Sequence, residues 1–159
     1  MKLSRCVPRR QQPRRRVVRA KQWIVALVLT LGASPCWSVC TVNVQSVLFG
    51  TYDTFSAFHL ESTGNVEVVC VLTTAYTIAL SPGNGSYAAR LMKSEVHSLG
   101  YNLYTDATRT TIWGDGTGGT GLIGGNAISA NHTIYGRVPA GQNVNVGSYS
   151  DSLIVTITF

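Results

Sequence analysis

The side chains that could carry acid–base chemistry in this chain are three histidines and three aspartates: His59, His97, His132, Asp106, Asp115 and Asp151. An enzyme site of this kind needs a nucleophile beside a base, or two carboxylates, within hydrogen-bond reach of the substrate. No spacing among the six residues matches such a pair. We interpret them as surface or turn residues, with Asp115 holding a turn and Asp151 fixing the start of the last strand. The chain is therefore predicted not to be an enzyme.

Cys40 and Cys70 are predicted to form a disulfide bond. The other two cysteines, Cys6 and Cys36, lie in an N-terminal segment that we expect to be removed, which leaves an even pair in an oxidising compartment. Closing this loop contributes ~3 to 4 kcal/mol in the chain-entropy model. Zinc would need two further ligands, and no histidine lies close by in the sequence. We expect neither a metal nor a cofactor.

The stretch "GTGGTG" at 116–121 has the glycine spacing of a dinucleotide-binding loop, with Gly116, Gly118 and Gly121 in the three places. Such a loop follows a buried strand and opens a helix, and no helical pattern follows here. A flexible hairpin loop accounts for the glycines.

Trp113 stands beside this loop and close in sequence to Tyr101 and Tyr104. An exposed aromatic group here would stack on a sugar and form an adhesin-like ligand patch. Packing in the core is the alternative, and both interpretations stay open at this point.

The first 38 residues read as a signal peptide. Nine of the 13 Lys and Arg lie at or before position 21, followed by the apolar run "WIVALVLTL" and the small residues "GASPCWS". The run is shorter than the ~20 residues that span a bilayer. We expect cleavage after Ser38 and no membrane-spanning segment. Cleavage after Ala33, a twin-arginine signal and a basic nucleic-acid-binding arm are alternatives that fit less well.

The remaining residues, 39–159, form one domain with an acidic balance. Seven acidic residues outnumber four basic ones, a net charge of −3; the basic residues are Arg90, Lys93, Arg109 and Arg137. This balance gives no electrostatic basis for a nucleic-acid partner. The length suits one domain with a single core.

Apolar residues in the domain recur at every second position, which predicts β-strands. Such stretches cover 41–49, 65–72, 75–81, 99–105, 132–138 and 152–159. Turn-forming residues separate them, as in "SPGNGS" and "PAGQN", and no stretch reads as an amphipathic helix. We predict an all-β sandwich.

Eight pieces of the chain, taken together and in order, resemble the spore coat U domain family. This family comprises secreted pilin-type subunits handled by archaic chaperone–usher systems. The pieces are "CTVNV" at 40–44, "FGTYD" at 49–53, "GNVEVVC" at 64–70, "YTIALSPGNG" at 76–85, "LGYNLYTDA" at 99–107, "IWGDG" at 112–116, "IYGRVPAGQ" at 134–142 and "GSYSDSLIVTITF" at 147–159.

The resemblance implies an incomplete immunoglobulin-like sandwich with an open groove beside its C-terminal strand. In the family, a periplasmic chaperone lends a strand to the groove. During assembly at the outer-membrane usher, a strand from a neighbouring pilin subunit replaces the chaperone's strand. The resemblance places the groove beside seven residues: Val42, Val44, Leu48, Leu153, Val155, Ile157 and Phe159. It also implies that basic residues of the chaperone grip the carboxylate of Phe159. The alternative is that these apolar residues face a closed core.

We therefore expect a non-enzymatic structural subunit of a surface fibre or coat, exported to the periplasm and then to the cell surface. One departure concerns the donated strand: after cleavage at Ser38, only Val39 precedes the Cys40 strand. This suits a tip or terminal subunit that receives a strand without giving one, or a self-contained coat protein whose edge is closed internally. The alternative is a secreted adhesin module that closes its own sandwich and binds a glycan.

Overall fold

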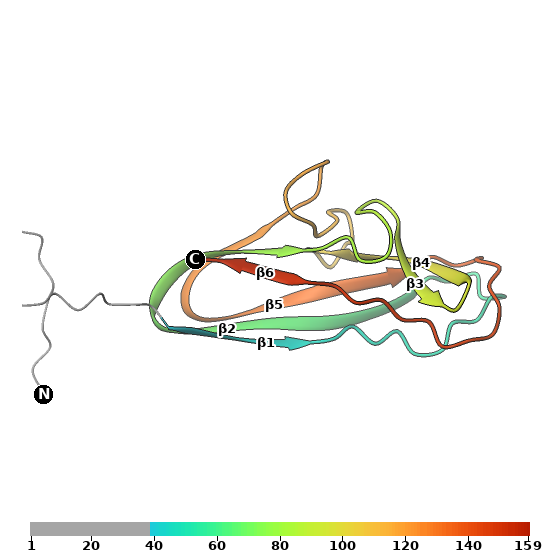
Figure 1. Ribbon diagram of the computed structural model, residues 1–159, viewed down its shortest axis with the longest axis horizontal. Helices are drawn as coiled ribbons and strands as arrows, with labels where there is room; N and C mark the ends of the chain where they lie inside the picture. The colour runs from blue at the N-terminus through green and yellow to red at the C-terminus, as the bar shows by residue number, and fades with distance from the viewer. Residues whose placement is uncertain (1–38) are drawn as a thin grey trace, which may run out of the picture. The chain divides into compact units, whose positions relative to one another are not determined.

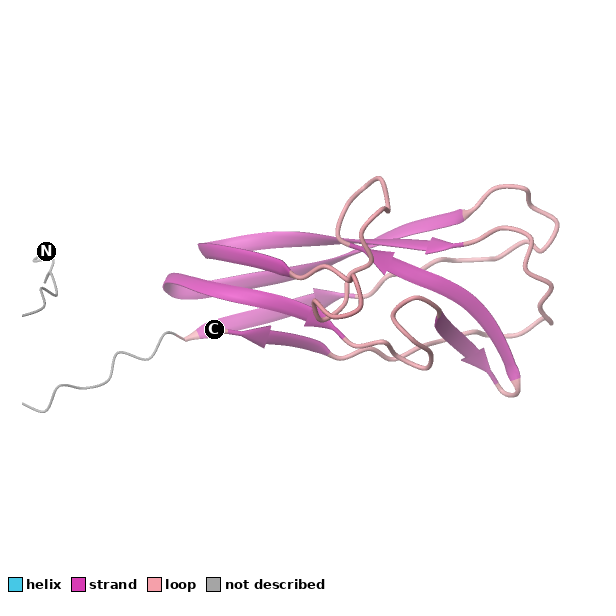
Figure 2. Cartoon of the chain, turned by 90° about the horizontal axis from the view of Figure 1, so that it is seen from above, coloured by secondary structure: helices cyan, strands magenta, loops and turns pink. Residues whose placement is uncertain are grey.

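A computed structural model describes residues 39–159, which fold into an all-β domain (Figures 1 and 2). The predicted signal peptide, including the predicted absence of a membrane span there, lies outside the described residues. Among residues 39–159 no helix is long and apolar enough to cross a membrane. The strands are β1 (Cys40–Gln45), β2 (Leu60–Leu80), β3 (Arg90–Ser94), β4 (His97–Tyr104), β5 (Ile123–Val138) and β6 (Val155–Thr158).

Two long strands, β2 and β5, lie side by side at the centre of the strand order. They pair antiparallel from Leu60↔Val138 to Ile78↔Ile123, with a register shift between Val69 and Thr74. Figure 1 shows both strands curling round at one end of the domain, so that each contributes to two facing layers. The extra residues of a bulge bend a strand and increase its twist. This bend corrects the sequence-based prediction, which divided β2 into two strands at 65–72 and 75–81.

The strands join in the order β1–β2–β5–β4–β3, and β6 pairs with the second half of β2. One layer therefore holds β1 against the first half of β2, with Val44 opposite Val66. The other layer holds β6 against the second half, with Val155 opposite Leu80. Strand β3, in a short stretch with little apolar content, was not predicted from the sequence.

Side chains from both halves of the bent strands meet in one core. The alternate residues Val66 and Val68 are buried in the first half of β2, and Ile78 and Leu80 in the second. Period-two burial of this kind is what the sequence pattern predicted. A disulfide joins Cys40 to Cys70 and so fixes β1 to its neighbour. The predicted all-β, immunoglobulin-like sandwich with one disulfide is confirmed.

Candidate functional site

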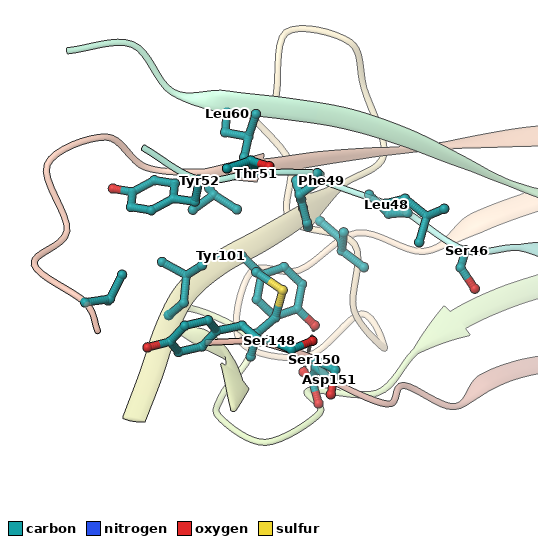
Figure 3. A pocket seen from close by; sticks show the side chains of 18 of the residues that line it. Ser46, Leu48, Phe49, Thr51, Tyr52, Leu60, Tyr101, Ser148, Ser150 and Asp151 are labelled. Atoms are coloured by element: carbon teal, nitrogen blue, oxygen red, sulfur yellow. Dashed lines mark hydrogen bonds between the residues drawn. The ribbon is translucent and has the colours of Figure 1, made fainter. Parts of the chain in front are cut away.

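A groove of about 1260 Å³ runs between two extended segments of the chain. The first wall, residues 44–55, continues from β1; the second wall, residues 144–155, leads into β6. Its floor is the apolar interior of the sandwich, made by Leu80, Met92, Leu99, Tyr101, Leu103, Ile134 and Val138. In Figure 3, Phe49 and Tyr52 of the first wall lie on one side of the groove, and Ser150 and Asp151 of the second wall on the other. The floor residues are at most 8% exposed, whereas the apolar wall residues Val44 and Leu48 are 44% and 79% exposed.

Where the chain continues from β1 into the first wall, it packs closely against two glycines of the neighbouring strands. A Cβ on Gly136 of β5 would lie 2.7 Å from the Phe49 ring and 2.8 Å from Val47 Cγ1, and a Cβ on Gly64 of β2 would lie 2.6 Å from Gln45 O. The two glycines thus form a notch in which Val47 and Phe49 pack against the core. Phe49 also meets Tyr101 edge-on, with ring centroids 5.9 Å apart.

Tyr52 ties the first wall to the loop after β5. Its hydroxyl donates to Pro139 O at 3.0 Å and accepts from Gln142 N at 2.8 Å. The Gln142 side-chain amide in turn donates to Gly100 O and accepts from Gly100 N, each at 2.8 Å. The wall is therefore held from β4 without being paired as a strand.

The second wall is held by backbone pairing and by one carboxylate. Lys93 and Ser150 exchange two backbone hydrogen bonds of 2.7 and 3.0 Å, and Ser81 N donates to Ile154 O at 2.9 Å. Asp151 accepts from Tyr101 Oη at 2.7 Å and from Ser152 N at 2.8 Å. Burial, together with this hydrogen bond, raises the pKa of Tyr101 above its usual value, so its hydroxyl remains a donor.

The two strands beside the groove each have one free edge. Within the described chain, β1 residues 41–45 and β6 pair with β2 alone. Val42 and Val44 lie opposite the buried Val68 and Val66, so they point to the interior face, yet they are 42% and 44% exposed. The inner face of β1 is therefore uncovered, with backbone donors and acceptors beside it.

The seven residues expected at the groove fall into two sets. Val44, Leu48, Leu153 and Val155 are part of its lining. Val42 and Ile157 lie further along β1 and β6, and the ring of Phe159 lies edge-on to Tyr76 at 6.4 Å. Sequence reasoning missed Val47, Phe49 and Tyr52, because the alternation of inward-facing residues changes from even to odd numbers after Val44 and back to even numbers after Phe49.

The aromatic ligand patch expected as one alternative does not form. Trp113 is fully buried, with Nε1 donating to Ile78 O at 3.0 Å, and Tyr101 is 5% exposed in the floor of the groove. Tyr104 pairs with Tyr135 at the end of β4. A buried indole cannot stack on a ligand, so core packing is the correct interpretation of Trp113.

The aspartates that the sequence placed in turns have that role. Asp115 accepts from Thr117 N at 2.9 Å in the glycine-rich loop, and Asp151 accepts from Ser152 N as described above. Asp106 accepts from the Thr108 hydroxyl and from Thr111 N and Thr110 N, and these bonds hold its pKa below the usual value. The glycine-rich loop is followed by β5 and not by a helix, so it lacks the structure of a dinucleotide site.

Each of the three histidines has its own hydrogen-bond partner. His59 Nδ1 accepts from Ala140 N, and His97 is hydrogen-bonded to Asn145. His132 is hydrogen-bonded to Tyr76 at 2.8 Å, and its burial lowers its pKa. Within residues 39–159, no three His, Cys, Asp or Glu side chains are grouped so that they could hold a metal ion.

Comparisons with known proteins agree with this architecture. The family model for the Spore Coat Protein U domain matches residues 28–156. Protein U of Myxococcus xanthus is 40% identical over 126 residues, which cover 70% of each chain.

Two solved structures are similar. One is a chain of the CsuC–CsuE chaperone–tip adhesion subunit pre-assembly complex from archaic chaperone-usher Csu pili of Acinetobacter baumannii, with a TM-score of 0.55 and 22% identity. That alignment covers 77% of the present chain and 40% of the solved chain, so the present chain spans well under half of it. The other is the minor tip subunit HdaB of the E. coli Hda pilus, with a TM-score of 0.42, 13% identity, and coverage of 74% and 79%. Because the family model matches most of the chain and Protein U aligns along most of its own length, this chain belongs to the Spore Coat Protein U domain family.

Proposed function

We propose that this chain is a non-enzymatic structural subunit of a surface fibre or coat, and that it assembles by receiving a β-strand in its groove. The observation that carries the proposal is the combination of an apolar floor with two free strand edges. A strand laid in the groove would hydrogen-bond to the free edge of β1 or of β6 and cover lining residues such as Val44 and Val155. Strand addition therefore completes the sandwich.

The lining of the groove indicates which strand would fit. Its interior is apolar, and its charged lining residues are the carboxylates Asp53 and Asp151. A donor strand with alternate apolar side chains and no acidic residue suits such a groove, because an unpaired carboxylate would meet like charges. Burying each large apolar side chain contributes roughly 1.5–3 kcal/mol. Four such residues would stabilise the domain by several kcal/mol.

A periplasmic chaperone is the donor proposed for the first step, and another pilin subunit for the second. Support comes from the fold shared with a chain of the chaperone–tip adhesion subunit complex of Csu pili. In this proposal residues 1–38 direct export, and an outer-membrane usher exchanges the donors. A tip or terminal position follows from the short segment expected ahead of Cys40.

Urea unfolding tests the proposal on protein exported from the full-length gene. One form ends at Phe159, and a second carries a short turn after Phe159 followed by an alternating apolar strand. The matched control carries the same strand with its apolar residues replaced by Asp. We expect the apolar fusion to unfold at a much higher urea concentration than both other forms.

Equal stability of all three forms would overturn the proposal. That result would mean that the sandwich closes by itself, as a self-contained secreted binding module would. A gain in the Asp-bearing control equal to that of the apolar fusion would also count against it, because a linked tail would then stabilise without filling the groove.

A further inference from the structure

The loop between β2 and β3 contains Asn84 followed by Gly85, the one Asn–Gly pair in the whole sequence. Both residues are exposed. The side chain of Asn84 is fixed to the second groove wall: Nδ2 donates to Asp151 Oδ1 at 2.8 Å, and the backbone N of Asn84 donates to the same oxygen at 3.2 Å. An amide thus bridges this loop to Asp151.

Gly85 is kept small by its surroundings. A Cβ at this position would collide with Ala89 O, in a turn where Ser86 and Ala89 exchange backbone hydrogen bonds of 3.1 Å. The residue after Asn84 therefore has no side chain to shield its backbone nitrogen. The other asparagines are followed by residues with side chains, such as Val66 after Asn65.

We propose that Asn84 is a site of spontaneous deamidation that weakens the anchoring of the second groove wall as the protein ages. The backbone nitrogen of Gly85 loses its proton, attacks Cγ of Asn84 and forms a C–N bond. The C–N bond to the side-chain nitrogen breaks, and that nitrogen takes up a proton and leaves as ammonia. Water then opens the succinimide to aspartate or isoaspartate. The net change is uptake of one water and loss of one ammonia, with no redox partner.

The position of Asp151 gives this chemistry a structural consequence. After deamidation a carboxylate replaces the amide that donated to Asp151, so two negative groups face each other at hydrogen-bond distance. Like charges this close disfavour the ionised pair. Asp151 also holds Ser152 N and the hydroxyl of Tyr101 in the floor of the groove. The strain therefore falls on the segment that leads into β6.

Mass spectrometry of the exported protein tests the first half of the proposal. The folded protein is incubated in mildly alkaline buffer and its peptides are mapped over time. We expect the mass gain of amide-to-acid conversion at Asn84, none at the internal control Asn65, and none in Asn84→Gln, whose longer side chain does not form the five-membered ring. The absence of any gain at Asn84, while a urea-unfolded sample gains it, would overturn the proposal.

Thermal unfolding of three variants tests the second half. We expect Asn84→Asp to lower the Tm by several degrees and Asn84→Gln to lower it less. The double variant Asn84→Asp with Asp151→Asn restores an amide–carboxylate pair and should recover part of the loss. An Asn84→Asp protein as stable as wild type, or a double variant that loses the sum of both single effects, would contradict the proposal. No donor strand enters these measurements, so their failure leaves the proposed function untouched.

Discussion

Two neighbouring regions of this domain are completed in opposite ways. Around Arg90, which is fully buried, every polar group is paired within the chain: the guanidinium donates to Asn102 Oδ1 at 2.7 Å, Trp113 O at 2.7 Å and Ser81 O at 3.0 Å. We call these four residues the Arg90 cluster. In the groove, by contrast, the outer edges of β1 and β6 have no strand partner within the described chain, and wall residues such as Val44 and Leu48 remain 44% and 79% exposed.

The difference shows which part of the fold the chain stabilises alone. Burial lowers the pKa of Arg90, but an arginine stays charged in proteins, and three oxygens compensate its loss of water. The Arg90 cluster joins the end of β2, strands β3 and β4, and the Trp113 segment, which together support the groove floor. The domain thus has a preformed floor and walls, on which the proposed strand addition would act.

Removing the guanidinium should have the largest effect. Arg90→Ala would leave the carbonyl oxygens of Ser81 and Trp113 without a donor, whereas Asn102 Oδ1 keeps the bond from Leu103 N. Each orphaned oxygen costs about 1–3 kcal/mol, so we expect a loss of about 2–6 kcal/mol. Urea unfolding measures it. The matched control is Arg137→Ala, which removes an exposed ion pair with Glu61 and should cost about 0–1 kcal/mol.

The comparison also predicts how Arg90→Ala behaves with an added strand. The variant should lower the stability of the bare protein and of the donor-strand fusion by the same amount. If the fusion instead restored full stability, the Arg90 cluster and the groove would be one cooperative site and the contrast between them would be wrong.

A methyl group in the notch should affect the groove more selectively. Gly136→Ala would push Cβ against Phe49 and Val47, and overpacking of this kind costs about 1–3 kcal/mol. Gly124→Ala on the same strand is the control, because its Cβ would lie 3.7 Å from Tyr76 O, an ordinary contact. Urea unfolding of the bare protein and of the donor-strand fusion should show that Gly136→Ala also reduces the gap between their free energies of unfolding. An unchanged gap would mean that the first wall does not shape the bound strand.

The sequence predicted the all-β class, the disulfide and the last strand, because alternation and cysteine parity are local signals. It did not predict that β2 is a single bent strand, since the bulge between Val69 and Thr74 interrupts the register without a Gly or Pro to mark it. The buried Arg90 was also missed, because its acceptors lie far apart in the sequence and arginines are mostly exposed.

The groove itself came from the resemblance to a family and not from the pattern of residues. Alternation shows that Leu153 and Val155 share a face, but it does not show whether another strand covers that face. The change of inward-facing residues after Val44 depends on the notch at Gly64 and Gly136, which only the paired strands bring together. The walls were therefore the part least accessible to sequence reasoning.

Loss of one hydroxyl should have a smaller effect on the same wall. Tyr52→Phe removes the hydrogen bonds to Pro139 and Gln142 and should cost about 1 kcal/mol in the bare protein. Tyr135→Phe is the control, because its ring contacts Arg109 and its hydroxyl has no hydrogen bond within the described chain. Amide hydrogen exchange should show faster exchange at Gln142 and Gly100 in Tyr52→Phe. Identical exchange in both variants would show that Tyr52 does not hold the wall.

The smallest effect is expected in the loop 105–111, which connects β4 to Trp113 of the Arg90 cluster. Hydrogen bonds from Thr108, Thr110 and Thr111 lower the pKa of Asp106 in the folded protein. In the unfolded chain an aspartate takes up a proton near pH ~3.9, so over the range below that value the unfolded state binds more protons and acid reduces stability. The stabilisation is complete above this pH and is lost as the pH falls towards the lower folded pKa.

Asp106→Asn should therefore show a shallower loss of stability in acid, measured as the urea midpoint against pH. The change should be equal in bare and fused proteins, because Asp106 does not line the groove. Parallel acid slopes for wild type and variant would contradict the assignment, and a change confined to the bare protein would place the effect in the groove.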